Sequence, residues 1–449
     1  MRMVGVAYRT LAVVSAVALV SVGCSKPSSI VSGASSSTAT PKIQIHGDAS
    51  TPVNKIALQA ISDLQQFWEG EYPKLYGSDY TPVNGGFFAV MPSSGDLPPC
   101  AATAADVAGN AFYCPKADNV AWDAEGLLPD LRKRFGDFVI PVVLAHEWGH
   151  AVQARANFEG ATVTREIQAD CFAGAWAAHA KADTFKPTDD ELDRALAGFL
   201  FLRDEPGTEK ADPSAHGSGF DRVNSFRTGF DKGVQACKGY RNGDPVVVEV
   251  PFRNAADLAA GGNAPYEDIL VGVPADLEDY WRQVYPKLTG EQWVPLQPVR
   301  AFDPSQAPAC GRQSTSGYAL FYCVPEDYVG FDAVRFMPQI YSQGGDFAVA
   351  TLIGTQYGLA VLARMGQDSS DKKVSLRADC LAGAWTASIL LEDRPESAYR
   401  LSPGDLDKAV SALLLFRGSG DVERQGQGSD RIDAYRDGVY NGVKSCLGN

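Results

Sequence analysis

The stretch ADCFAGAW at residues 169–176 recurs as ADCLAGAW at residues 378–385, which lie 209 positions further along the chain. The tripeptide FYC at residues 112–114 recurs at the same displacement, and Cys237 is matched by Cys446. Self-similarity over so long a displacement indicates duplication of a whole domain, because solenoid repeats have periods of only about 20–50 residues. The sequence therefore predicts two tandem domains of the same fold.

Each predicted domain mixes strands with helices. In the first copy, strand-like segments at 87–91 and 110–122 precede helical patterns at 138–156, 164–182, 188–203 and 219–236. A short sheet covered by helices is an α+β arrangement. We expect the domains at residues 48–240 and 265–449, with a linker at 241–264 in which residues 246–250 form a connecting strand.

Composition and charge restrict the class of protein. The chain has 449 residues, of which 45% are hydrophobic and 21% charged, which is ordinary for folded domains and wrong for a coiled coil or a disordered chain. Its net charge is −14. Electrostatic attraction to a nucleic-acid backbone or an anionic membrane is therefore excluded as the main function, and no nucleic-acid partner is expected.

The N-terminal segment predicts export. Two arginines precede an apolar run at residues 11–20, which is too short to span a membrane, and small residues lead to Cys24. This pattern resembles the lipobox of bacterial lipoproteins. It implies that residues 1–23 are a signal peptide, that Cys24 is acylated, and that the Ser/Thr/Pro-rich residues 24–47 are a tether. We expect a lipid-anchored protein on the outer face of the plasma membrane, with ordinary secretion as the alternative.

The cysteines predict disulfide bonds. If Cys24 carries lipid, eight of the nine cysteines remain, four in each copy at matching places. An even set in an exported chain is typical of disulfides. Pairing should stay within each copy, as Cys100–Cys114, Cys171–Cys237, Cys310–Cys323 and Cys380–Cys446. Crossed pairing within a copy is the alternative.

The first copy contains the pattern HEWGH, with His146, Glu147 and His150 in the positions of an HExxH motif. Residues four apart on a helix share a face, so the two imidazoles can bind one metal ion. Glu147 lies beside them, where it can act as general base toward a metal-activated water.

A further helix offers a third ligand. Glu166 and Asp170 are again four residues apart. Glu166 completes a His₂Glu set that leaves one coordination position open, and Asp170 can accept a hydrogen bond from the second nitrogen of a ligating histidine. A solvated helix face is the alternative for this pair. His216 is our candidate donor to the developing oxyanion, and a surface loop histidine is its alternative.

Several of these blocks together resemble a known family. AHEWGHAVQ at residues 145–153, EIQADCFAG at 166–174, FYCP at 112–115 and HGS at 216–218 are similar to the bacterial putative neutral zinc metallopeptidases. The resemblance covers most of residues 55–237. It implies a zincin-like fold, one Zn²⁺ and peptide-bond hydrolysis, with the roles falling on His146, Glu147, His150 and Glu166.

The second copy has lost these groups. Structural residues such as Asp379, Cys380 and Trp385 match their counterparts in the first copy, and every residue proposed for chemistry is replaced: His146 by Thr355, Glu147 by Gln356, His150 by Leu359, Glu166 by Ser375 and His216 by Gln425. We therefore expect an inactive pseudo-peptidase domain. It either binds a partner or packs on the first domain.

The sequence thus favours a zinc metallopeptidase of the cell envelope that acts on a peptide or protein substrate. Two alternatives stay open, a non-catalytic envelope binding or scaffold lipoprotein and a zinc cell-wall amidase that uses the same metal chemistry.

Overall fold

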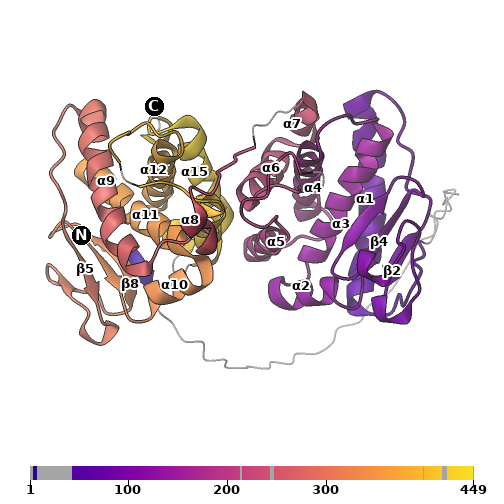
Figure 1. Cartoon of the computed structure of the whole chain (residues 1–449), viewed down its shortest axis with the longest axis horizontal. Helices are drawn as coiled ribbons and strands as arrows, with labels where there is room; N and C mark the ends of the chain where they lie inside the picture. Colours follow the sequence, from indigo (N-terminus) through magenta and orange to yellow (C-terminus); the bar gives the residue numbers. More distant parts are fainter. Residues whose placement is uncertain are drawn as a thin grey trace, which may run out of the picture.

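The computed structural model describes residues 4–7, 43–212, 215–242, 247–397, 399–416 and 422–447. Cys24, most of the predicted signal peptide and most of the tether lie outside these residues. The described chain forms two domains, each with a small sheet beside a group of helices (Figure 1).

The described α-helices and strands of the first domain are α1 (Pro52–Tyr76), β2 (Phe87–Val90), β3 (Ala111–Cys114), β4 (Asn119–Asp123), α2 (Leu127–Phe135), α3 (Val139–Arg155), α4 (Thr162–Ala182), α5 (Asp189–Phe201), α6 (Gly219–Lys232) and α7 (Val234–Cys237). The four helical patterns found in the sequence are confirmed as α3, α4, α5 and α6. The last pattern ends early because Gly233, at φ 73°, separates α6 from α7.

The sheet of the first domain has the order β2-β4-β3. The single strand expected at 110–122 is wrong, because a turn at residues 115–118 divides it into the antiparallel hairpin β3–β4. Asp118 takes up a positive φ of 50° in that turn. β2 pairs with β4 in parallel, so β3 is an edge strand.

The second domain repeats this plan. After the short linker helix α8 (Ala255–Ala259), its main elements are α9 (Tyr266–Thr289), β5 (Gln297–Phe302), β8 (Tyr318–Cys323), β9 (Tyr328–Asp332), α10 (Phe336–Gly344), α11 (Asp346–Arg364), α12 (Lys372–Leu390), α13 (Asp405–Leu415), α14 (Val422–Gln425) and α15 (Gly428–Asn441). A separate small ribbon pairs β6 (Ala309–Cys310) with β7 (Gln313–Ser314).

The main sheet of the second domain has the order β1-β8-β9-β5. Its strand β1 (Val4–Ala7) lies within the segment predicted to be a signal peptide and pairs antiparallel with β8. The connecting strand expected at 246–250 is wrong in the part that the structure describes, since residues 247–250 are not in a strand. The backbone N–H of Val248 instead donates to the carboxylate of Asp221 in α6.

The four disulfides join the cysteine pairs that the sequence predicts. Cys171–Cys237 and Cys380–Cys446 each close a loop with a sequence separation of 66, and Cys100–Cys114 and Cys310–Cys323 link the strand regions. No pair crosses between the domains. The covalent links thus follow the duplication.

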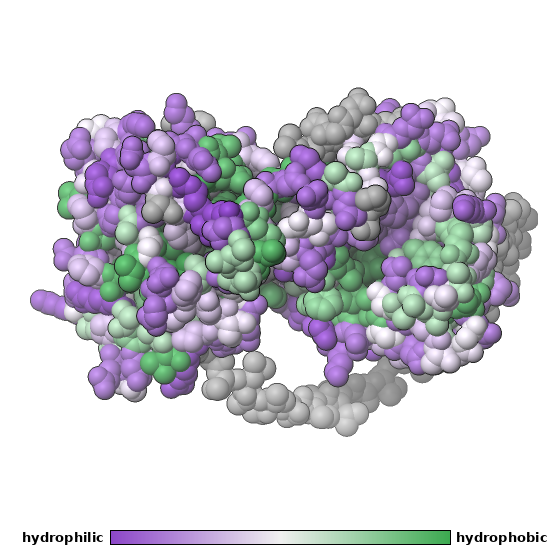
Figure 2. All heavy atoms as spheres, in the orientation of Figure 1, coloured by the Kyte–Doolittle hydropathy of each residue, from purple (hydrophilic) through white to green (hydrophobic). Residues whose placement is uncertain are grey.

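One described helix, α11, is long and apolar enough to cross a membrane. It is the counterpart of α3, and 94% of its most apolar window is buried inside the second domain. Its apolar character is therefore explained by its place in a protein core. On the face drawn in Figure 2, hydrophilic side chains cover much of both domains, and hydrophobic ones gather in a hollow of the first domain.

Candidate metal centre

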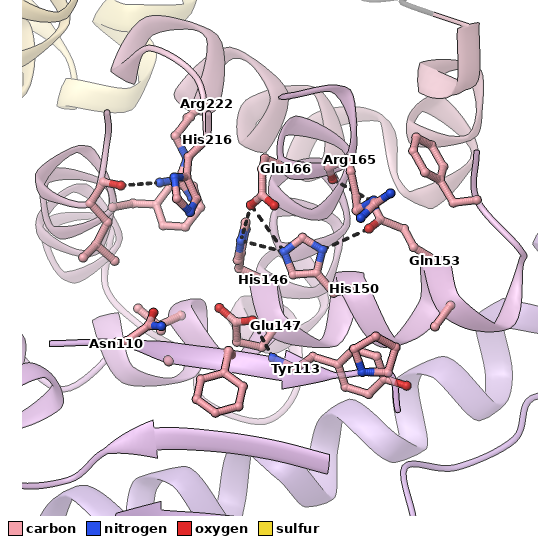
Figure 3. A pocket seen from close by; sticks show the side chains of 18 of the residues that line it. Asn110, Tyr113, His146, Glu147, His150, Gln153, Arg165, Glu166, His216 and Arg222 are labelled. Atoms are coloured by element: carbon pink, nitrogen blue, oxygen red, sulfur yellow. Dashed lines mark hydrogen bonds and ion pairs between the residues drawn. The ribbon is translucent and has the colours of Figure 1, made fainter. Parts of the chain in front are cut away.

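Two neighbouring helices carry the candidate ligands. His146 and His150 lie one turn apart on α3, and Glu166 lies on α4 (Figure 3). The helices approach closely at Gly149, where an added Cβ would stand 2.6 Å from the Cα of Ala169. Glycine between the two histidines therefore lets the helix backbones meet, and the ligands come within reach of one another.

The three donor atoms form a nearly equilateral triangle. Nε2 of His146 is 3.2 Å from Nε2 of His150, and Oε2 of Glu166 is 3.2 Å from the first nitrogen and 3.3 Å from the second. Zinc bonds of about 2.0–2.1 Å in tetrahedral geometry require ligand atoms about 3.3 Å apart. The donor set and its spacing therefore fit Zn²⁺.

Hydrogen bonds behind the imidazoles set their orientation. Nδ1 of His146 donates to Oδ1 of Asp170 at 2.6 Å, as the sequence predicted for Asp170. Nδ1 of His150 donates to Oε1 of Gln153 at 3.0 Å, and the amide of Gln153 donates to the carbonyl of Arg165. With both Nδ1 atoms engaged, both Nε2 atoms are left for a metal.

Gln153 is a residue that the sequence reasoning missed. A signal was available, because Gln153 stands three residues after His150 and such residues are neighbours on a helix surface.

A buried arginine anchors Asp170. Arg222 of α6 binds both oxygens of Asp170, at 2.9 and 3.0 Å. In the second domain Arg431 binds Asp379 in the same way, at 2.8 and 3.0 Å. The Asp–Arg pair is therefore part of the duplicated scaffold, and only the first domain uses it to hold a histidine.

Charge in the site is arranged to receive a cation. Burial acts to raise the pKa of Glu166, but the two imidazoles hold it well below the ordinary value. Burial acts to lower the pKa of His146, but Asp170 outweighs it and raises that pKa to about 10. A proton on the imidazole thus balances the carboxylates in the metal-free site, and a metal ion would replace it.

Glu147 faces the cavity from the same helix. It is 7% exposed, and its Oε2 accepts the backbone N–H of Tyr113 in β3 at 3.0 Å. Burial is the main cause that raises the pKa of Glu147. A buried carboxylate with a raised pKa and a fixed orientation has the properties of a general base.

A cavity of about 790 Å³ opens over these groups. The edge strand β3 lines it through residues 111–113. Figure 3 shows Glu147 between this strand and the imidazoles.

His216 also lines the cavity, from the segment before α6. Its side chain is 52% exposed, and its Nδ1 lies 3.1 Å from Oδ1 of Asp204. The hydrogen bond to Asp204 raises the pKa of His216. His46 and His179 lie elsewhere: His46 stacks on Phe88 and His179 is beside Asp63.

The counterpart region of the second domain holds polar groups that are weaker metal ligands than imidazole and carboxylate groups. The hydroxyl of Thr355 donates to a carbonyl of its own helix, and the side-chain oxygens of Gln356 and Ser375 are buried without a protein partner. Among the residues that the structure describes, a cluster of three potential metal ligands occurs only at His146, His150 and Glu166.

Comparisons with known proteins agree with this duplicated architecture. A family model described as "Putative neutral zinc metallopeptidase" matches residues 3–240 and again 253–442. The uncharacterized protein YpfJ of Escherichia coli strain K12 is 31% identical over 150 residues, which cover 28% of this chain and 52% of that protein. The uncharacterized protein Rv2575 of Mycobacterium tuberculosis strain H37Rv is 29% identical over 176 residues, covering 33% and 56%. The chain thus spans about half the length of these curated relatives, and no solved structure matches it.

Proposed function

This chain belongs to the putative neutral zinc metallopeptidase family, and on that premise we propose that its first domain is a zinc-dependent peptidase and its second an inactive copy. One observation carries the proposal. The three donor atoms of His146, His150 and Glu166 stand 3.2–3.3 Å apart, and Glu147 points into the cavity beside them. A purely structural zinc site does not need a buried carboxylate next to an open coordination position.

The reaction we propose is hydrolysis of a peptide bond. When bound by His146, His150 and Glu166, zinc would supply Lewis-acid activation of a water and of the scissile carbonyl. Glu147 accepts the proton of the attacking water at its carboxylate and delivers it to the leaving nitrogen. The N–H of Tyr113 keeps that carboxylate oriented. His216 lines the same cavity, and we propose that it donates to the developing oxyanion.

We also propose that the protein works at the cell envelope. The leader and the lipobox-like residues before Cys24 support export and lipid anchoring on the outer face of the plasma membrane, and four disulfides fit an oxidising compartment. The substrate would then be a peptide or protein that reaches this surface.

The variant Glu147→Gln tests the catalytic role. We expect the purified variant to bind zinc as the parent does and to lose at least about 10²-fold in peptide hydrolysis, because the amide cannot accept the water proton. The matched control is Gln356→Ala at the equivalent position of the second domain, which should leave both zinc content and hydrolysis unchanged. Retained hydrolysis in Glu147→Gln would exclude this residue as the base.

The substrate that is cleaved distinguishes the peptidase from the two alternatives, a cell-wall amidase and a non-catalytic binding or scaffold lipoprotein. Peptide libraries and peptidoglycan are incubated with the parent protein, each with and without a chelator. Chelator-sensitive cleavage of peptides supports the peptidase, and cleavage of peptidoglycan alone supports a cell-wall amidase. If neither substrate is cut while Glu147→Gln retains the biological function of the parent, the protein is a non-catalytic binding or scaffold lipoprotein.

A further inference from the structure

The two domains meet through the same pair of helices from each. α5 and α6 of the first domain pack against α13 of the second, and α6 also contacts α15. Arg227 of α6 donates to Asp433 of α15. The equivalent residues make the reciprocal contact: Arg436 of α15 donates to Oδ1 of Asn224 in α6 at 2.6 Å. The interface therefore has the self-complementary pattern of a two-fold symmetric dimer within one chain.

Two equivalent aspartates show this reciprocity most clearly. Asp193 of α5 accepts the N–H groups of Gly428 and Ser429 at the start of α15, at 2.8 and 3.0 Å. Asp407, which occupies the same place in α13, accepts the N–H of Phe220 at the start of α6, at 2.8 Å. Each domain thus caps the last long helix of the other with a buried carboxylate, 3% exposed for Asp193 and 2% for Asp407.

The cap from the inactive domain lies directly behind the metal centre. Arg222 stands two residues after Phe220, and it holds Asp170, which holds His146. Asp407 also reaches Arg222 by a second set of contacts. Nη1 of Arg222 donates to the carbonyl of Leu202 at 2.7 Å. Nε of the next residue, Arg203, lies 3.0 Å from Oδ2 of Asp407. Asp407 is therefore tied to both segments that position the Arg222 guanidinium.

The first turn of α6 is packed closely against Asp407. An added Cβ at Gly219 would stand 3.2 Å from the carboxyl carbon of Asp407 and 2.7 Å from Leu200. Arg222 is 3% exposed, its guanidinium lies 4.3 Å from the centre of the Phe199 ring, and it borders the cavity of the candidate metal centre. A shift of the first turn of α6 would therefore also move Arg222 at the edge of that cavity.

We propose that Asp407 of the inactive domain is a positioning residue for the zinc site of the first domain. It fixes the first turn of α6, so that Arg222 and Asp170 hold the imidazole of His146 in the orientation that the metal requires. The second domain would thus supply, through the carboxylate of Asp407, the contact on which the zinc site of the first domain depends. This inference rests on the proposed zinc site but concerns metal binding and not the identity of the substrate.

The test compares two equivalent variants in the full-length protein. Asp407→Ala and Asp193→Ala each remove one helix cap from the same interface, but the cap that Asp407 forms is on α6, the helix that carries Arg222. Zn²⁺ affinity is measured by competition with a chelating dye, the absorption spectrum is recorded after Co²⁺ substitution, and thermal unfolding is followed for each metal-free protein.

We expect Asp407→Ala to weaken Zn²⁺ binding by about 10-fold or more, the size of effect seen when residues behind metal ligands are removed, and to change the Co²⁺ spectrum. Asp193→Ala should keep the Zn²⁺ affinity within about two-fold of the parent and should keep the parent's Co²⁺ spectrum. It should nevertheless lower the unfolding temperature by about as much as Asp407→Ala does. Asp407→Glu, which keeps the carboxylate, should recover part of the affinity, and Asp407→Asn serves if the alanine variant does not fold.

Equal affinities for the parent and Asp407→Ala, or equal losses in Asp407→Ala and Asp193→Ala, would overturn the positioning role while leaving the proposed peptidase intact. A parent protein that binds no zinc would overturn both proposals. The two failures are therefore distinguished by the parent's own affinity.

Discussion

At the scale of single residues, the orientation of the two imidazoles decides whether they can bind one metal ion. His146 and His150 can bind a metal together because Asp170 and Gln153 occupy their Nδ1 atoms and leave Nε2 free. The same logic makes Glu166 the residue to test first, because it is the only proposed ligand outside the HExxH motif.

Replacing Glu166 by alanine should reduce zinc bound per chain. The variant loses one of three ligands and leaves two imidazoles facing each other, so we expect the affinity for Zn²⁺ to fall by at least about 10²-fold. Elemental analysis after dialysis against buffered zinc provides the measurement. Ser375→Ala, at the matching place in the second domain, is the control, and an unchanged metal content in Glu166→Ala would show that another group completes the site.

At the scale of elements, the packing of α3, α4 and α6 turns a helical motif into a site. α3 and α4 approach at Gly149, and α6 brings Arg222 against Asp170. The edge strand β3 adds a backbone donor for Glu147. α6 also carries a titratable group at its buried start, Asp221, whose carboxylate accepts from Ser218 and from Val248 of the linker.

Burial raises the pKa of Asp221 to about 7, above its ordinary value of 3.8. A carboxyl group whose folded-state pKa lies above its unfolded value contributes stability that is complete below about pH 4 and is lost as the pH rises to about 7. Asp221→Asn cannot ionise, so its stability relative to the parent should increase by on the order of 4 kcal/mol between pH 4 and pH 8.

Denaturant unfolding of parent and variant at both pH values measures this difference. The control is Asp430→Asn at the equivalent start of α15, where the carboxylate is 42% exposed. A constant difference between Asp221→Asn and the parent from pH 4 to pH 8 would contradict the expectation.

At the scale of the whole molecule, the duplication produced one chain in which the second domain covers the back of the candidate metal centre of the first. Each domain has two disulfides at matching places and contributes half of a reciprocal interface, but the domains differ in the groups at the candidate metal centre. Metal binding should therefore stabilise a structure that spans both domains.

Zinc should raise the unfolding temperature of the full-length protein, and a chelator should lower it. Free zinc at 100 times its dissociation constant contributes about 2.7 kcal/mol to the stability of the state that binds it. Scanning calorimetry with buffered zinc and with chelator provides the measurement, and Glu166→Ala should show no shift. An identical shift in that variant would place the stabilising zinc elsewhere.

Several features of this protein follow from the sequence by itself. The duplication, the HExxH pair with Glu166, the disulfide pairing and the loss of every ligand in the second copy were all readable, because each depends on spacing along the chain or on comparing one half with the other. The four helices that carry or support the site were also predicted from the sequence, because their apolar periodicity is a local pattern.

Other features were decided only by the tertiary structure. The bond from Tyr113 to Glu147 and the cap that Asp407 places on α6 join segments that lie far apart in the sequence. Arg222 lies 52 residues from Asp170, and Asp407 lies 187 residues from Phe220. Contacts over such separations depend on how whole elements pack, and that packing is a property of the complete fold that no local pattern records.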